Sequence, residues 1–185
     1  MARVPTATQD SIPSDQKTAF QEVVEQRGEV PAAGPASIMI NVPEIAKRAG
    51  HLSDYLRKES TLSSRIQELA MLVTARELDC QYIWNAHAAA GRRAGLSDET
   101  VDQLRERREL TALARDEAAV VTFGREFFRT RRISEPSFKA AMAQFGVRGL
   151  TELTNLMGYY AMLAFNINAF EVDLPAERTE PVLPV

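Results

Sequence analysis

Apolar residues recur every three to four positions along most of the chain, which is the spacing of an amphipathic helix. Phe20, Val23 and Val24 form such a stripe over residues 15–27, and Ser14 stands where it can cap this helix. Strand-like alternation and the Asn-Gly or Asp-Gly pairs of tight hairpins are missing. The pattern therefore predicts an all-α fold.

A second helix is predicted to begin with Asn41 as its cap and Pro43 in its first turn, where the missing amide proton costs nothing. Its apolar stripe is Ile45, Leu52 and Leu56. The next helical pattern begins at residue 64 and runs without Gly or Pro as far as residue 91. No residue in that stretch announces a break, so the pattern by itself predicts one long helix.

Four further helical segments follow, of which ARDEAAVVTFGREFFRT is the second. Ser97 is placed to cap the first, and Pro136 and Gly146 bracket another. In the last segment, GLTELTNLMGYYAMLAFNINAF, apolar residues occupy nearly the whole circumference. A helix of that kind is expected to be buried or to lie in a subunit interface.

The chain divides into three parts by pattern and composition. Residues 1–40 are predicted to form an N-terminal arm with one helix, and residues 41–175 a helical domain. Residues 176–185 are expected to be an irregular tail, because the closing stretch VDLPAERTEPVLPV is rich in proline.

Length and charge limit the classes of function. A chain of 185 residues suits one domain and can bury a sizeable core. The net charge of -3 supplies no basic field for nucleic acid. No apolar run approaches the roughly 18 residues of a membrane span, and the first thirty residues contain no apolar signal region. We therefore expect a cytoplasmic protein with no nucleic-acid or membrane partner.

The stretch ELDCQYIWNAHAAAG contains the single cysteine, Cys80, and one of two histidines, His87. In a helix these two residues share a face but stand about 10 Å apart along the axis, which is too far for a hydrogen bond. The residue one turn before His87 is Ile83. Local geometry therefore does not support a direct Cys–His nucleophilic pair.

Two interpretations are open for each of these side chains. Cys80 is either a small buried hydrophobic residue or a thiolate favoured by a helix N-terminus. His87, set among alanines, is either a hydrogen-bonded histidine between helices or a general acid–base group in a pocket. Two histidines and one cysteine are too few for a zinc site.

Glu68 is the third candidate, because it interrupts the apolar stretch IQELAMLV. An ordinary solvent-facing glutamate is one interpretation. In one straight helix Glu68 and His87 would be about 28 Å apart. They can meet only if the chain turns back between them.

The spacing of Glu68, Cys80, Ile83 and His87, together with the surrounding stretch from SSRIQELAMLV to SDETVDQLR, resembles the carboxymuconolactone decarboxylase and alkylhydroperoxidase D-like (AhpD-like) superfamily. The resemblance covers about residues 40–175. It implies an AhpD-like helical bundle that assembles as a homo-oligomer, which would be a trimer, a hexamer or a dimer. It also implies a break between two helices near residues 78–80, which would bring Glu68 toward His87.

The chain departs from the redox branch of this superfamily, whose motif is Glu-x11-Cys-x2-Cys-x3-His. Ile83 occupies the position of the second cysteine, which in that branch attacks the peroxide. A two-cysteine peroxidase cycle is therefore excluded. A one-cysteine, peroxiredoxin-type cycle at Cys80 would need an outside thiol.

The resemblance implies that the protein is a decarboxylase-like lyase. Such an enzyme needs no cofactor and acts on a small carboxylated metabolite, either a lactone or an aromatic-derived compound. We expect His87 to transfer the proton, and we expect Glu68 to orient the His87 side chain or to share its proton. The expected pocket residues are Tyr82, Ile83 and Trp84, with Arg76 or Arg115 as the clamp for a substrate carboxylate. The alternatives are a thiol antioxidant that uses Cys80 alone and a non-catalytic oligomeric binding protein.

Overall fold

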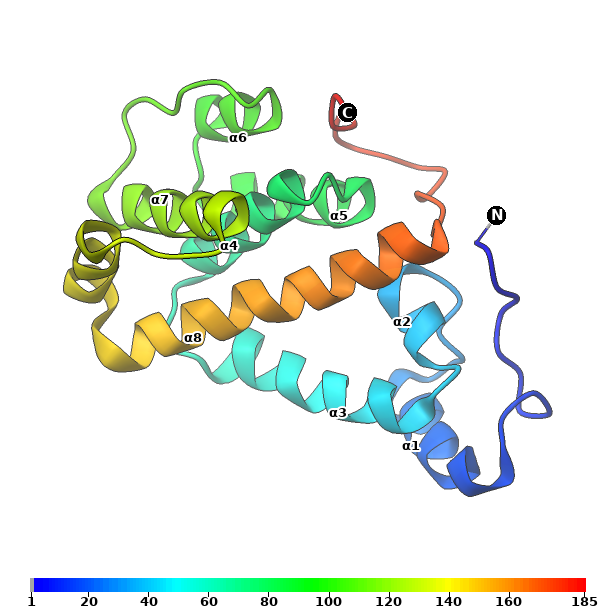
Figure 1. The fold of residues 1–185 in the computed structure, drawn as a ribbon. Helices are drawn as coiled ribbons and strands as arrows, with labels where there is room; N and C mark the ends of the chain where they lie inside the picture. The colour runs from blue at the N-terminus through cyan, green and yellow to red at the C-terminus, as the bar shows by residue number, and fades with distance from the viewer. Residues whose placement is uncertain (1) are drawn as a thin grey trace.

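The computed structural model describes residues 2–185, and every regular element among them is helical (Figure 1). The all-α prediction is confirmed. No helix in this part of the chain is long and apolar enough to cross a membrane. The elements are η1 (Ser14–Gln16), α1 (Lys17–Arg27), α2 (Gly34–Met39), α3 (Pro43–Asp54), η2 (Tyr55–Glu59), α4 (Ser64–Glu77), α5 (Gln81–Arg93), α6 (Asp98–Arg105), α7 (Arg115–Thr130) and α8 (Glu135–Phe170).

Helix α4 is the centre of the bundle. Every residue from Ile66 to Arg76 is buried, and the helix packs against α5, α7 and α8. Its apolar side chains, such as Leu69 and Leu72, are completely covered. Burial of a leucine of this kind contributes about 1.5–3 kcal/mol relative to leaving it exposed. The core therefore forms around the helix that carries Glu68.

The start of α3 differs from the prediction. Val42, not Asn41, is the N-cap residue, and it has no side chain that can accept from the helix. The Asn41 amide instead donates to the carbonyl oxygens of Ser37 and Ile38, at 3.3 and 3.0 Å. Asn41 thus closes the end of α2 because the preceding carbonyls are within its reach.

The predicted apolar stripe of α3 is also only partly correct. Leu56 is buried, but Ile45 is 50% exposed and Leu52 is 42% exposed. No element among residues 2–185 covers that face of the helix. The spacing is helical, as expected, but helical spacing does not tell which partner buries an apolar face.

The single long helix expected between residues 64 and 94 is wrong, and the break implied by the family resemblance is present. α4 ends at Glu77, and Asp79 adopts a left-handed backbone conformation with φ of 50°. The amide of Cys80 then donates to the carbonyl of Ala75 at 2.8 Å. Asp tolerates this conformation better than most residues. The apolar pattern continues across the turn because both helices face the same core.

Helix α8 is interrupted at Gly146, where φ is 64° and ψ is -176°. Such a conformation is accessible almost only to glycine. The sequence predicted a helix end at this glycine. The long second part of α8 crosses the molecule from there (Figure 1), with Leu153, Leu156 and Tyr160 buried.

Both ends of the chain dock near the C-terminal end of α8 and on α5 (Figure 1). The amide of Arg3 donates to the carbonyl of Phe170 at 2.9 Å. In the tail, Leu183 is buried, and its backbone exchanges two hydrogen bonds with the side chain of Gln81, at 2.7 and 2.8 Å. The tail has no helix, but it lies against the bundle.

Candidate functional site

The turn at Asp79 folds α5 back along α4 and brings His87 to Glu68. Nδ1 of His87 lies 2.8 Å from Oε2 of Glu68. Both side chains are largely buried, with 11% and 8% exposed. A carboxylate can only accept, so Nδ1 carries the proton of this hydrogen bond. Nε2 is then the ring atom available to another molecule.

Nε2 of His87 is open to its surroundings. None of the hydrogen bonds within residues 2–185 involves it, and the neighbouring Ala86 and Ala90 are exposed and half-buried. In this part of the chain, the side-chain polar atoms that are both buried and without a partner are Arg76 Nε, Trp84 Nε1 and Arg125 Nε. Nε2 of His87 has no partner either, but it is not buried in this way. The small alanine side chains leave the imidazole edge accessible.

Arg57 places a cation beside this pair. Its Nη2 donates to Oε1 of Glu68 at 3.3 Å, and its Nη1 donates to the hydroxyl of Tyr160 at 3.1 Å. The side chain is 39% exposed, so one part of the guanidinium faces solvent. Arg57 belongs to η2, a π-helical turn closed by a 3.0 Å bond from the amide of Ser60 to the carbonyl of Tyr55. π-turns are frequent at functional sites.

Tyr160 of α8 covers the imidazole from the side. Its ring centroid lies 5.1 Å from that of His87, and the two planes cross at 80°. Burial raises the pKa of Tyr160 to about 12, so the group remains a neutral phenol. Its oxygen accepts from Arg57, and its hydroxyl proton stays available for donation.

Glu152 of α8 fixes the segment that carries Arg57. Its carboxylate accepts from the Tyr55 hydroxyl at 2.9 Å, from the Thr61 amide at 2.8 Å and from Nε of Arg148 at 3.0 Å. Burial acts to raise the pKa of Glu152, but hydrogen bonds from these three residues outweigh it and lower the pKa from 4.5 to about 2. Glu152 therefore binds, as a carboxylate, the first residue of η2 and the segment just after η2.

Cys80 is the N-cap residue of α5 and has no exposed surface. Burial raises the pKa of its thiol, although the amides of Ile83 and Tyr82 act in the opposite direction. A thiol that is buried and protonated is a poor nucleophile. This geometry agrees with the interpretation of Cys80 as a small buried hydrophobic residue.

The other predicted pocket residues are not gathered around His87. Ile83 and Trp84 belong to the core, with 2% and 1% exposed. Tyr82 lines a cavity elsewhere, beside α2 and the chain ends. Of the residues 82–84, only Ile83 stands one helical turn before His87. Its side chain has no group that can donate a hydrogen bond, transfer a proton or act as a nucleophile.

The two predicted arginine clamps also lie away from the pair. Arg76 is 2% exposed; it forms an ion pair with Asp79 and donates to the carbonyl of Pro184 at 3.0 Å. Arg115 begins α7 and borders a cavity with Thr61 and Ser63. Neither arginine has a hydrogen bond or ion pair with Glu68 or His87 in the described residues.

Sequence reasoning did not find Arg57 and Tyr160. Arg57 stands in the exposed-looking stretch YLRKES, where nothing marks a π-turn. Tyr160 stands beside Tyr159 in the last helix, and nothing in the sequence marks one of the two. Among residues 2–185 there is no group of three or more His, Cys, Asp or Glu side chains that could hold a metal ion.

Residues 43–125 match the model of the carboxymuconolactone decarboxylase family. This segment is therefore similar to the carboxymuconolactone decarboxylase family, and the chain has the fold of AhpD-like proteins. The matched segment contains Glu68, Cys80 and His87, and also Arg57. No curated protein matches the chain in sequence.

Solved structures share the fold at low sequence identity. A peroxidase-related protein from Ralstonia eutropha, described as an alkylhydroperoxidase AhpD core, has a TM-score of 0.71 at 18% identity, over 95% of this chain and 93% of that one. A putative antioxidant defence protein AhpD from Agrobacterium tumefaciens has a TM-score of 0.66 at 20% identity, over 73% and 93%. The debrominase Bmp8 has a TM-score of 0.69 at 14% identity, over 94% and 92%. A cysteine-to-alanine variant of that debrominase was solved with 2,3,4-tribromopyrrole.

Proposed function

We propose that the protein is a cofactor-independent lyase that removes carbon dioxide from a small carboxylated metabolite, a lactone or an aromatic-derived ring. The observation that carries this proposal is the 2.8 Å contact between Glu68 and His87 with Nε2 of the imidazole left open. A histidine held by a carboxylate at one nitrogen can deliver a proton from the other.

The reaction needs two events. The bond between the ring carbon and the carboxylate breaks, carbon dioxide leaves, and the electron pair passes into the conjugated carbonyl of the ring. The protonated imidazole of His87 then donates its Nε2 proton to the ring carbon. Glu68 holds Nδ1 and stabilises the imidazolium before the transfer. Because the ring carbonyl accepts the electron pair, the step is complete without a cofactor.

Arg57 is the proposed clamp for the substrate carboxylate. Its guanidinium is tied to Glu68 and to Tyr160, yet part of it faces solvent. Arginine binds carboxylates through two parallel hydrogen bonds. A carboxylate on the exposed edge of Arg57 would lie near His87, because Arg57 contacts one oxygen of Glu68 and His87 contacts the other.

The observations support thiol chemistry less well. Cys80 has no exposed surface and burial raises its thiol pKa. Ile83, in place of an attacking cysteine, removes the group that would stand nearest to His87. The debrominase of the same fold was solved with a small brominated ring, which supports a ring compound as the substrate class here.

The test is release of labelled carbon dioxide from a panel of small unsaturated lactone acids and aromatic acids carrying a labelled carboxylate. Wild type and His87→Gln are compared, with His51→Gln as the matched control because His51 is exposed on α3. We expect release by wild type and by His51→Gln, and loss in His87→Gln. Equal release by wild type and His87→Gln contradicts the proposal, and so does release by none of them across the panel.

We also propose that the chain associates with further copies of itself. Leu52 and Tyr55 are exposed and border a shallow cavity with Thr151 and Asn155 of α8. Apolar patches of this kind mark interfaces. Light scattering after gel filtration should give an oligomer for wild type and a smaller species for Leu52→Glu; a monomeric wild type contradicts this. Other large apolar side chains exposed on α3 and α8 are Ile45, Phe138, Val147, Met162 and Phe165.

A further inference from the structure

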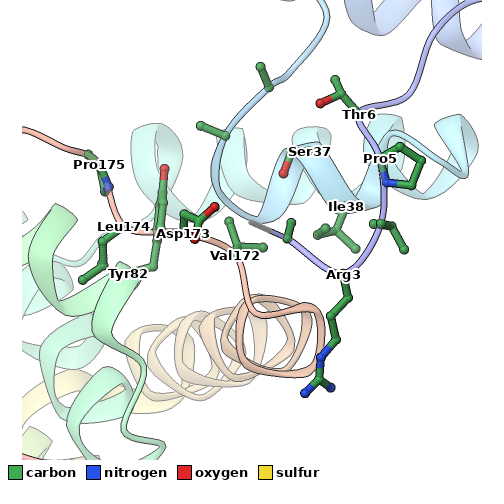
Figure 2. A pocket seen from close by; sticks show the side chains of 14 residues that line it. Arg3, Pro5, Thr6, Ser37, Ile38, Tyr82, Val172, Asp173, Leu174 and Pro175 are labelled. Carbon is green, nitrogen blue, oxygen red and sulfur yellow. The ribbon is translucent and has the colours of Figure 1, made fainter.

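A cavity of about 650 Å³ lies where α2, α5 and the two chain ends meet. Figure 2 shows Ser37 and Ile38 of α2 on one side, Tyr82 of α5 on another, and the segment from Val172 to Pro175 between them. This volume lies within the range of small-molecule sites, which is about 300–1,000 Å³. The remaining lining residues are Ala2, Arg3, Val4, Pro5, Thr6, Ala32 and Ala33.

The cavity is distinct from the site at His87. Tyr82 and His87 are five residues apart on α5, so their side chains leave the helix about 140° from each other. Neither Glu68, His87 nor Arg57 lines the cavity. The two regions therefore lie on different faces of the same helix.

The hydroxyl of Tyr82 is one of the polar groups that line the cavity, together with the Thr6 hydroxyl and the Asp173 carboxylate. The Tyr82 hydroxyl takes part in none of the hydrogen bonds within residues 2–185. It is also not among the polar atoms of that range that are buried without a partner, so it is accessible to a ligand. Burial raises the pKa of Tyr82, so the group is a neutral phenol. An accessible hydroxyl without a protein partner can donate to a ligand or accept from it.

Gly34 leaves room for the ring of Tyr82. Gly34 has a left-handed φ of 64°, and a Cβ built there would stand 2.9 Å from the Tyr82 hydroxyl oxygen and 3.0 Å from the ring. Any larger residue at position 34 would push the ring away. Glycine at position 34 therefore lets the Tyr82 hydroxyl lie at the start of α2.

Two of the charged and polar neighbours, Arg3 and Ser37, are already engaged. The Arg3 guanidinium turns away from the cavity toward the end of α8 (Figure 2), where it donates to the carbonyl of Ala169 at 3.1 Å and pairs with Glu171. The Ser37 hydroxyl donates to the carbonyl of Gly34 at 2.7 Å. Because the described lining residues offer no cation that points into the cavity, the site does not favour a carboxylate.

We propose that this cavity is a second binding site, which takes a neutral, mostly apolar ring compound whose single hydroxyl or carbonyl group pairs with the Tyr82 hydroxyl. The aliphatic wall covers the ring, and Tyr82 fixes its orientation. The chemistry differs from that proposed at Arg57, where an anion is bound. The inference does not depend on the proposed lyase activity.

The test uses fluorine NMR with 4-fluorophenol as the probe and 4-fluorobenzoate as its charged counterpart. We expect 4-fluorophenol to bind to one site on wild type and 4-fluorobenzoate to be excluded from it. Tyr82→Phe, which removes only the hydroxyl, should weaken phenol binding roughly fivefold, the effect of one lost hydrogen bond. Ala33→Phe, which fills the cavity from an exposed position of extended backbone, should abolish it.

Two control variants show whether the phenol binds at Tyr82 or elsewhere on the protein. Tyr55→Phe also removes one tyrosine hydroxyl, but away from the cavity, and it should leave phenol binding unchanged. His87→Gln should do the same, so the result is independent of the lyase assay. Unchanged phenol affinity in Tyr82→Phe overturns the proposal even if Ala33→Phe does not fold. No binding by wild type at the solubility limit of the probe overturns it as well.

Discussion

Nδ1 of His87 and Oε2 of Glu68 are 2.8 Å apart, although the two residues are separated by 19 positions in the sequence. One straight helix would hold them about 28 Å apart. The left-handed turn at Asp79 removes that separation by folding α5 onto α4. The candidate site therefore depends on the left-handed backbone conformation of Asp79, a residue that takes no part in the proposed chemistry.

The hydrogen bond predicts an unusual tautomer for His87. Because Glu68 accepts from Nδ1, neutral His87 should carry its proton on Nδ1, which nitrogen-15 chemical shifts of the imidazole report directly. Glu68→Ala should remove this preference. His51, which is exposed, is an internal reference in the same spectra. A wild-type His87 protonated on Nε2 when neutral would refute the arrangement.

Substitution of Arg57 should act on substrate binding. With a carboxylated substrate, Arg57→Gln should raise KM roughly ten- to a hundredfold, because hydrogen bonds to a charged group contribute about 1.5–3 kcal/mol. Arg57→Lys should recover part of the loss, since it restores the charge but not the planar fork. Steady-state kinetics separates KM from kcat. A fall in kcat with KM unchanged would argue against a clamp.

Glu152 should contribute to stability at neutral pH and lose this contribution in acid. The pKa of Glu152 is about 2 in the folded chain, below its ordinary value of 4.5. Its stabilisation is therefore complete above about pH 4.5 and is lost as the pH falls through about 2. Glu152→Gln should cost about 1–3 kcal/mol at neutral pH, the range for a buried group left unsatisfied.

Urea unfolding of wild type and Glu152→Gln at several pH values measures both effects. The difference in free energy of unfolding between them should shrink as the pH is lowered from 4.5 toward 2. A difference that stays constant over that interval would show that the charge of Glu152 does not contribute.

Two glycines of α8 form a matched pair. A Cβ at Gly146 or at Gly158 would meet no atom within 4 Å, but only Gly146 has a positive φ. Gly146→Ala should therefore cost about 1–3 kcal/mol, whereas Gly158→Ala should add about 0.5–1 kcal/mol of stability. Thermal unfolding compares the two directly. Equal effects would mean that the interruption of α8 is not enforced by the backbone of residue 146.

The sequence predicted the helices well because helical spacing is a local signal. It placed the cap of α6 at Ser97, whose hydroxyl accepts from the amide of Thr100 at 3.0 Å, and the interruption of α8 at Gly146. It failed at Asp79, because the apolar positions continue through the turn. It also failed on Ile45, since the exposure of that face depends on tertiary contacts.

The candidate site was only partly predictable. Glu68 and His87 were found through a family resemblance, since the spacing alone kept them apart. Arg57 comes from a π-turn without a sequence signature, and Tyr160 stands more than seventy residues beyond His87 in the sequence. Nothing in the sequence distinguishes Arg57 from the chain's other arginines, because its place beside Glu68 is set by contacts between distant segments.

The central claim is that His87, and not Cys80, performs the chemistry. The most direct test compares Cys80→Ser with His87→Gln in one assay of carbon dioxide release from a substrate found in the panel. We expect Cys80→Ser to retain the wild-type rate and His87→Gln to lose roughly a hundredfold or more, the usual contribution of a general acid. A loss in Cys80→Ser with full activity in His87→Gln would contradict the account and assign the reaction to the thiol.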